Sequence, residues 1–270
     1  MKSDWVVHKF GGTSVANAER YRAAADIVLA SGPGEHVGVI VSAMSGVTNE
    51  LIKTVELAAK RDSAYLTTLA NLERRHLQTV SELELGPDQT ESLSKTIAYD
   101  FDALEEVLRG VWITRLPSER IIEFVSGHGE LWSAQLLHAF LAARGHASGW
   151  LDARDVLVVE PQSNTVVIDW PLSQEKLKKW QLDHGDKKLL IITGYIAATH
   201  DGVATTLKRN GSDFSGSIFA ALLGARSLII WTDVDGVYSA DPRRVPEAVI
   251  VPELSYQEAA ELAYFGAKVI

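Results

Sequence analysis

The sequence predicts an α/β fold in which helices cover both faces of a mostly parallel sheet. Short apolar runs typical of strands alternate with segments of helical periodicity along most of the chain. One such run, residues 36–41, is almost wholly apolar, as expected of a strand that is buried on both faces. The chain has 270 residues, of which 46% are hydrophobic, and α/β domains of this size occur as single units. We therefore expect one domain with two lobes.

The first sixty residues are predicted to form two successive units of strand, loop and helix. In the first unit the strand is followed by Gly11 and Gly12, which suit a tight turn. In the second unit the strand runs into a loop rich in hydroxyl groups. The segments are residues 5–10, 11–17 and 18–29 in the first unit, and residues 36–41, 42–49 and about 50–60 in the second.

A long helical region follows, and its polar-rich composition indicates an insertion that covers a sheet. It spans residues 64–112 and is broken at residues 86–88, where a proline is well placed just inside a helix start. Residues 117–144 are helical again, with an expected interruption at residues 126–130. The two glycines there cost about 1 kcal/mol each relative to alanine, so a packing or binding reason should offset them.

The last third returns to strands and ends in a helix. Residues 189–198 are β-rich, and the alternating run 203–207 after a turn predicts a hairpin. Because the chain stops at Ile270 directly after an amphipathic helix, we expect it to be part of a longer protein. The other segments are a loop over 208–213, a helix of small residues to 224, a strand over 227–231, a loop over 232–238 and the helix over 256–265.

Composition and charge exclude several classes of partner and site. Lys and Arg number 26 against 35 Asp and Glu, and the net charge of −9 predicts no nucleic-acid and no membrane partner. The absence of cysteine excludes disulfides, thiolate metal sites and cysteine nucleophiles. No apolar run reaches the roughly 18 residues of a membrane span, and no signal peptide is evident. These features favour a cytoplasmic protein.

The loop after the first predicted strand is a candidate anion site. Open α/β sheets bind ligands outside the carboxyl ends of their strands. Lys9 and Phe10 end this strand, and the following Gly11 and Gly12 allow backbone N–H groups to approach a phosphate. A tight turn beside a solvated lysine is the alternative interpretation, and it is equally open from the local sequence.

Two further stretches offer groups that could bind a substrate. The hydroxyls of residues 42–49 could bind a carboxylate or only cap the following helix. Glu130, which follows the two helical glycines, could bind a cation or be a charge on the helix surface. The local pattern leaves both pairs of interpretations open.

The loops near the C-terminus hold the remaining candidates. Arg209 suits bidentate recognition of a carboxylate or phosphate, while Ser212 and Asp213 could bind ligand or only cap a helix. The loop 232–243 could serve an active site or be a turn-rich surface loop.

Several familiar catalytic motifs are absent from the sequence. It contains no P-loop, no complete dinucleotide fingerprint, no G-x-S-x-G elbow and no H-E-x-x-H. Its eight histidines are scattered singly, which favours structural roles over metal binding. Metal ligands therefore stay unassigned.

Taken together, six segments resemble the aspartokinases of the amino acid kinase superfamily. The resemblance implies a three-layer αβα sandwich around a mostly parallel sheet of about eight strands. It also implies one catalytic domain over residues 1–270, in which a lobe of about 1–200 binds aspartate and a truncated lobe of about 201–270 binds ATP, without the family's ACT regulatory domains. The six segments are residues 9–14, 41–49, 126–130, 205–213, 232–243 and 264–268.

The resemblance implies a reaction as well. ATP phosphorylates the β-carboxylate of L-aspartate and gives 4-phospho-L-aspartate and ADP, the first step towards lysine, threonine and methionine. ATP and Mg²⁺ are the implied cofactors, and the full-length parent is expected to be a homodimer.

Individual residues acquire roles through the resemblance. Lys9 neutralises the transferring phosphoryl group, and Asp213 orders that lysine. Glu130 binds the ammonium of the substrate and Arg209 its α-carboxylate. The other implied substrate contacts are Ser42, Thr48, Tyr195 and Ser212, and the implied nucleotide contacts are Lys9, Phe10, Gly11, Gly12, Thr232, Asp233, Tyr238, Arg243 and Lys268.

One segment departs from the family's pattern. Many relatives have Gly-Arg-Gly-Gly-Ser-Asp where this chain has Lys-Arg-Asn-Gly-Ser-Asp over residues 208–213. Asn at position 210 is familiar from aspartokinases fused to homoserine dehydrogenase, whereas Lys208 is less expected.

Two other functions stay open beside aspartate kinase. One is a kinase of the same fold that uses another acceptor, such as glutamate or a nucleoside monophosphate. The combination of Glu130 and Arg209 favours an α-amino acid instead. The other is a catalytically silent binding or assembly module, against which the retention of Lys9, the glycines and Asp213 argues.

Overall fold

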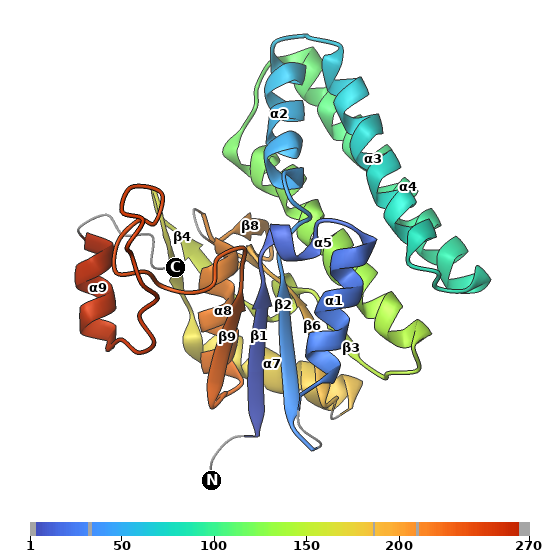
Figure 1. Ribbon diagram of the computed structural model, residues 1–270. Coiled ribbons are helices and arrows are strands. Elements are labelled where there is room, and N and C mark those ends of the chain that lie inside the picture. The colour runs from blue at the N-terminus through green and yellow to red at the C-terminus, as the bar shows by residue number, and fades with distance from the viewer. Residues whose placement is uncertain (1–3, 32–33, 186, 209–210, 265–270) are drawn as a thin grey trace. The chain divides into compact units, whose positions relative to one another are not determined.

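The structure is a computed structural model that describes residues 4–31, 34–185, 187–208 and 211–264 (Figure 1). Contacts within the chain divide it into two compact units, Met1–Trp231 and Thr232–Ile270. The expected lobe boundary near residue 200 stays a prediction.

A five-stranded parallel sheet forms the centre of the first unit, in the order β3-β6-β2-β1-β9. The predicted α/β class with a mostly parallel sheet is therefore confirmed. The expected eight strands are too many for the described residues, where four further strands are three residues long and form two antiparallel pairs outside this sheet. The sheet contains β1 (Trp5–Phe10), β2 (His36–Val41), β3 (Gly149–Leu151), β6 (Leu189–Thr193) and β9 (Ser227–Trp231), and the pairs are β4 (Val159–Pro161) with β5 (Val166–Ile168) and β7 (Ile196–Ala198) with β8 (Ala204–Thr206).

Helices cover both faces of the sheet and form the outer layers of the unit (Figure 1). Along β2, Val39 and Val41 belong to one hydrophobic core, while Ile40 between them belongs to the other. This alternation follows from the opposite directions of successive side chains in a strand, and explains why an apolar run was needed there. The helices are α1 (Ala18–Leu29) and α5 (Glu119–Ala143) on the first face, and α7 (Trp170–His184) and α8 (Gly211–Leu222) on the second.

The predicted helical insertion is present and packs on α5. It consists of α3 (Ala64–Glu82) and α4 (Pro87–Thr114) with the expected break between them, and the separately predicted α2 (Val47–Ala59) packs beside it. Pro87 occupies the first turn of α4, where its missing N–H would have no helical partner. Helix α2 begins three residues before the predicted start at residue 50.

The expected interruption of α5 at residues 126–130 is wrong, because the helix is continuous there. A Cβ added at Gly127 would lie 2.8 Å from Ile196 Cγ2, and one added at Gly129 would lie 2.7 Å from Ala43 Cβ. The glycines thus allow α5 to approach the β2–α2 loop and the β7 strand closely. Tertiary contact offsets their unfavourable helix propensity.

Residues 145–188 form elements that were not predicted from the sequence. They contain β3, α6 (Ala153–Val156), β4, β5 and α7. A strand of three residues is too short to show a period of two, which explains why β3, β4 and β5 were not predicted. The short 3-10 helix η1 (Gly12–Val15) after β1 was also not expected.

In the described part of the second unit, residues 232–264, a loop region is followed by a helix. Tyr238 and Ile250 form an isolated antiparallel bridge, and α9 (Tyr256–Tyr264) confirms the amphipathic helix expected over residues 256–265. Within the described ranges, none of the helices combines the length and apolar character needed to cross a membrane.

Candidate active site

Lys9 lies near the carboxyl end of β1 and points towards α8. Its side chain is only 5% exposed, and its ammonium forms an ion pair with Asp213 in the first turn of α8. A Cβ added at Gly216 would lie 3.3 Å from Lys9 Cβ, so the lysine stem runs beside a bare stretch of that helix. The alternative of a solvated lysine beside a turn is therefore wrong.

Gly11 and Gly12 bring three backbone segments together beside this ammonium. The Gly11 N–H donates a hydrogen bond of 3.1 Å to the carbonyl of Trp231 at the end of β9. A Cβ added at Gly11 would lie 3.6 Å from Lys9 Nζ, and one added at Gly12 would lie 2.9 Å from the carbonyl oxygen of Ala43. The loops after β1 and β2 can approach this closely only because Gly12 has no side chain.

Glu130 is buried and lies against the loop that follows β2. The residue is only 3% exposed to solvent, and Oε2 of its carboxyl group has no hydrogen-bond partner. Burial raises the pKa of this carboxyl to about 8, although the backbone N–H of Ala43 opposes the shift by bonding to it. The interpretation of Glu130 as a surface charge is therefore wrong.

Ser42 adds a second unpartnered polar atom at the end of β2. Its hydroxyl is buried and makes no hydrogen bond. Buried polar groups are normally satisfied, so an unsatisfied hydroxyl and carboxylate call for an explanation such as a ligand. The alternative that a hydroxyl caps α2 is wrong, since its N-cap is Gly46, with a φ of 81° and no side-chain cap. Thr48 lies half-buried in the first turn of α2.

Tyr195 follows β6 in a strained conformation and packs on the start of α8. Its φ is 63°, in a region that residues other than glycine seldom adopt. The Tyr195 N–H donates to Ser215 Oγ at 2.8 Å, and that hydroxyl donates to the Gly211 carbonyl at 2.7 Å. A Cβ added at Gly211 would lie 2.7 Å from the Tyr195 ring. The role of Ser215 in holding Tyr195 was not predicted from the sequence.

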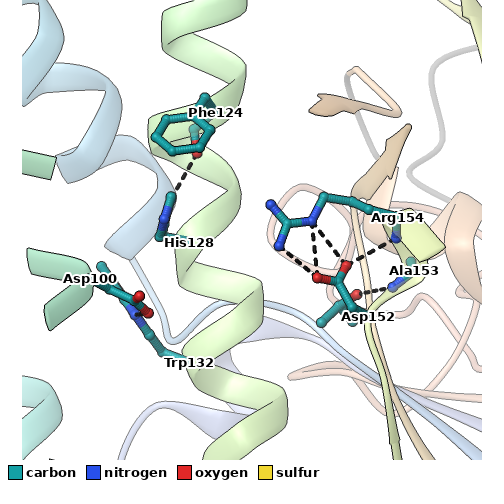
Figure 2. A network of polar contacts seen from close by, with 8 residues as sticks. Asp100, Phe124, His128, Trp132, Asp152, Ala153 and Arg154 are labelled. Atoms are coloured by element: carbon teal, nitrogen blue, oxygen red, sulfur yellow. Dashed lines mark hydrogen bonds and ion pairs between the residues drawn. The ribbon is translucent and has the colours of Figure 1, made fainter. Parts of the chain in front are cut away.

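A polar contact on the side of the insertion ties helix α5 to α4 (Figure 2). Trp132 Nε1 donates to Asp100 of α4 at 2.9 Å, and His128 Nδ1 donates to the Phe124 carbonyl at 2.9 Å. Burial lowers the pKa of His128, which favours a neutral ring. The Trp132–Asp100 bond therefore ties the helix that carries Glu130 to α4, whereas the His128–Phe124 bond lies within α5.

Figure 2 also shows a polar cluster formed by the residues that directly follow the edge strand β3. Asp152 accepts hydrogen bonds from Arg154, the shortest of them 2.6 Å. The N–H of Ala153 donates to Thr193 Oγ1 at 2.8 Å, which ties the end of β3 to the end of β6. No residue of this cluster was expected to take part in the site.

Several expected site residues are not placed with Lys9. Arg209 and Lys268 lie outside the described residues, as does the side chain of Ser212. Thr232, Asp233, Tyr238 and Arg243 lie in the second unit. Arg243 is 88% exposed and pairs with Asp241 at 3.0 Å, and it lowers the pKa of that carboxyl through its hydrogen bond. Their roles stay predictions.

In the described part of the chain, no group of three His, Asp or Glu side chains could hold a metal ion. Of the two candidate carboxylates, Asp213 is paired with Lys9, and Glu130 accepts a hydrogen bond from the backbone N–H of Ala43.

Comparisons with known proteins agree with this architecture. The model of the amino acid kinase family matches residues 4–270. The chain is 47% identical over 267 residues to the chloroplastic bifunctional aspartokinase/homoserine dehydrogenase 2 of Arabidopsis thaliana, which covers 98% of this chain and 29% of the relative. It is 35% identical to bifunctional aspartokinase/homoserine dehydrogenase 2 of Escherichia coli, over 98% of this chain and 32% of that relative.

A solved structure extends the similarity to three dimensions. Aspartokinase III of E. coli in complex with aspartate and ADP superposes with a TM-score of 0.86 at 31% identity, over 98% of this chain and 57% of that one. The chain thus spans about a third or less of the two bifunctional relatives and over half of the solved one. The family model matches residues 4–270, and the fold has the parallel sheet with the Lys9–Asp213 pair at the carboxyl end of β1. The chain therefore belongs to the amino acid kinase family.

Proposed function

We propose that this chain is the catalytic domain of an aspartate kinase. It transfers the γ-phosphoryl group of ATP to the β-carboxylate of L-aspartate, which yields 4-phospho-L-aspartate and ADP. The observation that carries the proposal is the buried Glu130 carboxylate, whose Oε2 has no partner although the group lies close to the Lys9 loop. Ala43 connects Glu130 to the loop after Lys9: its N–H donates a hydrogen bond to Glu130, and its carbonyl oxygen lies against Gly12.

The acceptor is bound by the groups that the fold leaves unsatisfied. An α-ammonium gives Glu130 the positive partner that it lacks, and stabilises the ionised form of a carboxyl that burial otherwise keeps protonated. Ser42 and Thr48 supply hydroxyls to the substrate oxygens, and Tyr195 lines the site. Arg209 and Ser212 complete it in the proposal by binding the α-carboxylate.

Phosphoryl transfer in this site needs no general base. A carboxylate is already a nucleophile at neutral pH, so catalysis reduces to alignment and to neutralisation of charge. Lys9 supplies a buried positive charge, and Asp213 holds it at the carboxyl end of β1. The Gly11 and Gly12 loop and the N-terminus of α8 favour negative charge at the same place.

Nucleotide and metal would be held as follows. Lys9, Phe10, Gly11 and Gly12 would contact the phosphates, and the loop region of the second unit would hold the rest of the nucleotide through Thr232, Asp233, Tyr238, Arg243 and Lys268. Mg²⁺, when bound, neutralises phosphate charge and takes most of its ligands from phosphate and water oxygens, which fits a site without a carboxylate cage.

The relatives support this assignment. The two relatives from Arabidopsis thaliana and Escherichia coli are named bifunctional aspartokinase/homoserine dehydrogenases, and the solved aspartokinase III is in complex with aspartate and ADP. We also propose a homodimer in the full-length parent, with neither nucleic acid nor membrane as partner. A cytoplasmic location is a proposal as well, to which the relative named chloroplastic gives no support.

The test is ATP consumption that requires L-aspartate, with the acyl phosphate trapped as a hydroxamate. Glutamate and a nucleoside monophosphate serve as competing acceptors in the same assay. We expect turnover with aspartate to exceed turnover with either one. Preferred turnover of another acceptor would replace aspartate with that acceptor, and absence of turnover with all three would leave a silent module as the better interpretation.

A further inference from the structure

Helix α5 carries two buried carboxylates that serve two different loops. Glu123 and Glu130 are seven residues apart, which is about two helical turns and places both on one face. Glu130 meets the Ala43 N–H in the loop after β2. Glu123 accepts a hydrogen bond of 2.9 Å at Oε2 from the hydroxyl of Thr205 in β8. Helix α5 therefore contacts both the loop after β2, where the acceptor is proposed to bind, and strand β8, which precedes α8 in the chain.

Lys208, which follows β8, is the charge partner of Glu123. Its ammonium pairs with Glu123 Oε1 and also donates to Glu119 Oε1 at 2.6 Å. The Lys208 side chain is 13% exposed, that of Glu123 10% and that of Glu119 73%, so the pair with Glu123 is the buried one. Burial lowers the pKa of Lys208, but its hydrogen bonds to both carboxylates outweigh this effect and raise the pKa. Lys208 is therefore a cation at neutral pH.

The backbone at Lys208 is unfavourable for a residue with a side chain. Its φ is 62°, where glycine is favoured over other residues by roughly 1 kcal/mol. A lysine at this position therefore needs a compensating contact. The buried pair with Glu123 provides one.

Lys208 is also joined directly to the start of α8. Its carbonyl accepts a hydrogen bond of 3.2 Å from the N–H of Gly211, the first residue of that helix. Two residues further on, Asp213 pairs with Lys9. A continuous series of contacts thus runs from α5 through Lys208 to the Lys9–Asp213 pair.

We propose that Lys208 is a positioning residue that fixes the start of α8 against α5, and so sets the separation between Glu130 and the Lys9–Asp213 pair. This rests on the proposed function, in which the acceptor spans that separation with its ammonium at Glu130 and its side-chain carboxylate near Lys9. A fixed separation suits one acceptor length. Lys208 therefore acts on the affinity for a short acidic α-amino acid, and on its selection over one that is longer by a methylene.

The decisive variant is Lys208→Gly, because glycine accepts the backbone conformation at this position. We expect the KM for aspartate to rise about tenfold or more, while the KM for ATP stays within about twofold. The ratio of kcat/KM for aspartate to that for glutamate should fall as well. Lys208→Arg keeps the positive charge, so it should recover part of the affinity for aspartate.

Two control variants separate positioning from charge burial. Glu119→Gln removes the exposed partner only, and should leave every constant within about twofold. The double variant Lys208→Gly with Glu123→Gln leaves no buried charge unpaired, since Glu119 is exposed to water, so it should unfold at nearly the wild-type denaturant concentration and still bind aspartate weakly. A wild-type KM for aspartate in this double variant would overturn the proposal.

The outcome separates this proposal from the proposed function. A wild-type chain without aspartate-dependent turnover contradicts the proposed function, and with it the acceptor role of Lys208. An active wild type whose Lys208→Gly variant keeps both its aspartate KM and its preference over glutamate contradicts only the role of Lys208.

Discussion

The ammonium of Lys9 and the carboxylate of Asp213 form an ion pair between the end of β1 and the first turn of α8. The pair holds a buried positive charge at the edge of the sheet where substrates of this fold class bind. Its position depends on Gly216, beside which the lysine stem passes.

Replacing this lysine should abolish most of the activity and leave the fold intact. In Lys9→Ala we expect kcat to fall about 10²–10³-fold, because the transferring phosphoryl group loses the positive charge that Lys9 supplies in the proposed function. Hydroxamate formation measures the rate, and circular dichroism measures the fold. Lys53→Ala, which changes an exposed lysine of α2, is the matched control. Full activity of a folded Lys9→Ala chain would remove Lys9 from its proposed role.

Aspartate binding should release a proton from Glu130. Its pKa is about 8 in the free protein because of burial, so the carboxyl is mostly protonated at pH 7. An incoming ammonium stabilises the ionised form, and close to one proton should leave per aspartate bound. Calorimetry in buffers of different ionisation enthalpy measures this number. Glu130→Gln should release none, and equal release from both proteins would contradict the assignment.

The same group should make stability depend on pH in the absence of ligand. The folded-state pKa of Glu130 is raised above its usual value of 4.5, so its contribution is fully present below pH 4.5 and is lost as the pH rises through about 8. Relative to Glu130→Gln, the wild type should therefore lose on the order of a few kcal/mol of unfolding free energy over this window. Urea titrations of both proteins at pH 5 and pH 8.5 give the comparison, and a difference independent of pH would argue against a buried Glu130.

Two helical glycines should respond in opposite directions to the same substitution. A Cβ at Gly110 in α4 meets no atom within 4 Å, so Gly110→Ala should raise the free energy of unfolding by about 0.5–1 kcal/mol. A Cβ at Gly129 would lie 2.7 Å from Ala43 Cβ, so Gly129→Ala should lower it by about 1–3 kcal/mol. Denaturant unfolding measures both. A stabilising Gly129→Ala would mean that α5 does not approach the β2–α2 loop as described.

Ser215 should matter for both stability and substrate binding. In Ser215→Ala the partly buried N–H of Tyr195 loses its acceptor, which should cost about 1–2 kcal/mol of unfolding free energy. The KM for aspartate should rise because Tyr195 is no longer held in its strained conformation. Ser217→Ala, on the exposed side of the same helix, should change stability by at most about 0.5 kcal/mol. Similar losses in both variants would speak against the specific role of Ser215.

Local patterns were sufficient for much of the fold. The strands β1, β2 and β9 and the helix α1 have the predicted bounds, because each combines a clear period with glycine or polar residues at its ends. The continuity of α5 could not be predicted, since its glycines are favoured by contacts with Ala43 and Ile196 that are remote in sequence. The three-residue strands carried too little signal.

The sequence was sufficient to name several residues of the site, but not to predict which of them contact one another or are buried. The resemblance singled out Lys9 and Asp213, and the structure joins them across more than two hundred residues. The burial of Glu130 could not be read from its helical surroundings, which suit an exposed charge equally well. Lys208 and Glu123 lie 85 positions apart, and only the fold brings them together.

The central place of β1 has a consequence for the nascent polypeptide. β1 is flanked by β2 on one side and by β9, residues Ser227–Trp231, on the other. While the ribosome is still synthesising the chain, one edge of the strand that bears Lys9 has no neighbour until β9 has emerged from the exit tunnel. Such an open edge invites pairing with other polypeptides, so cellular chaperones would be needed most during this interval.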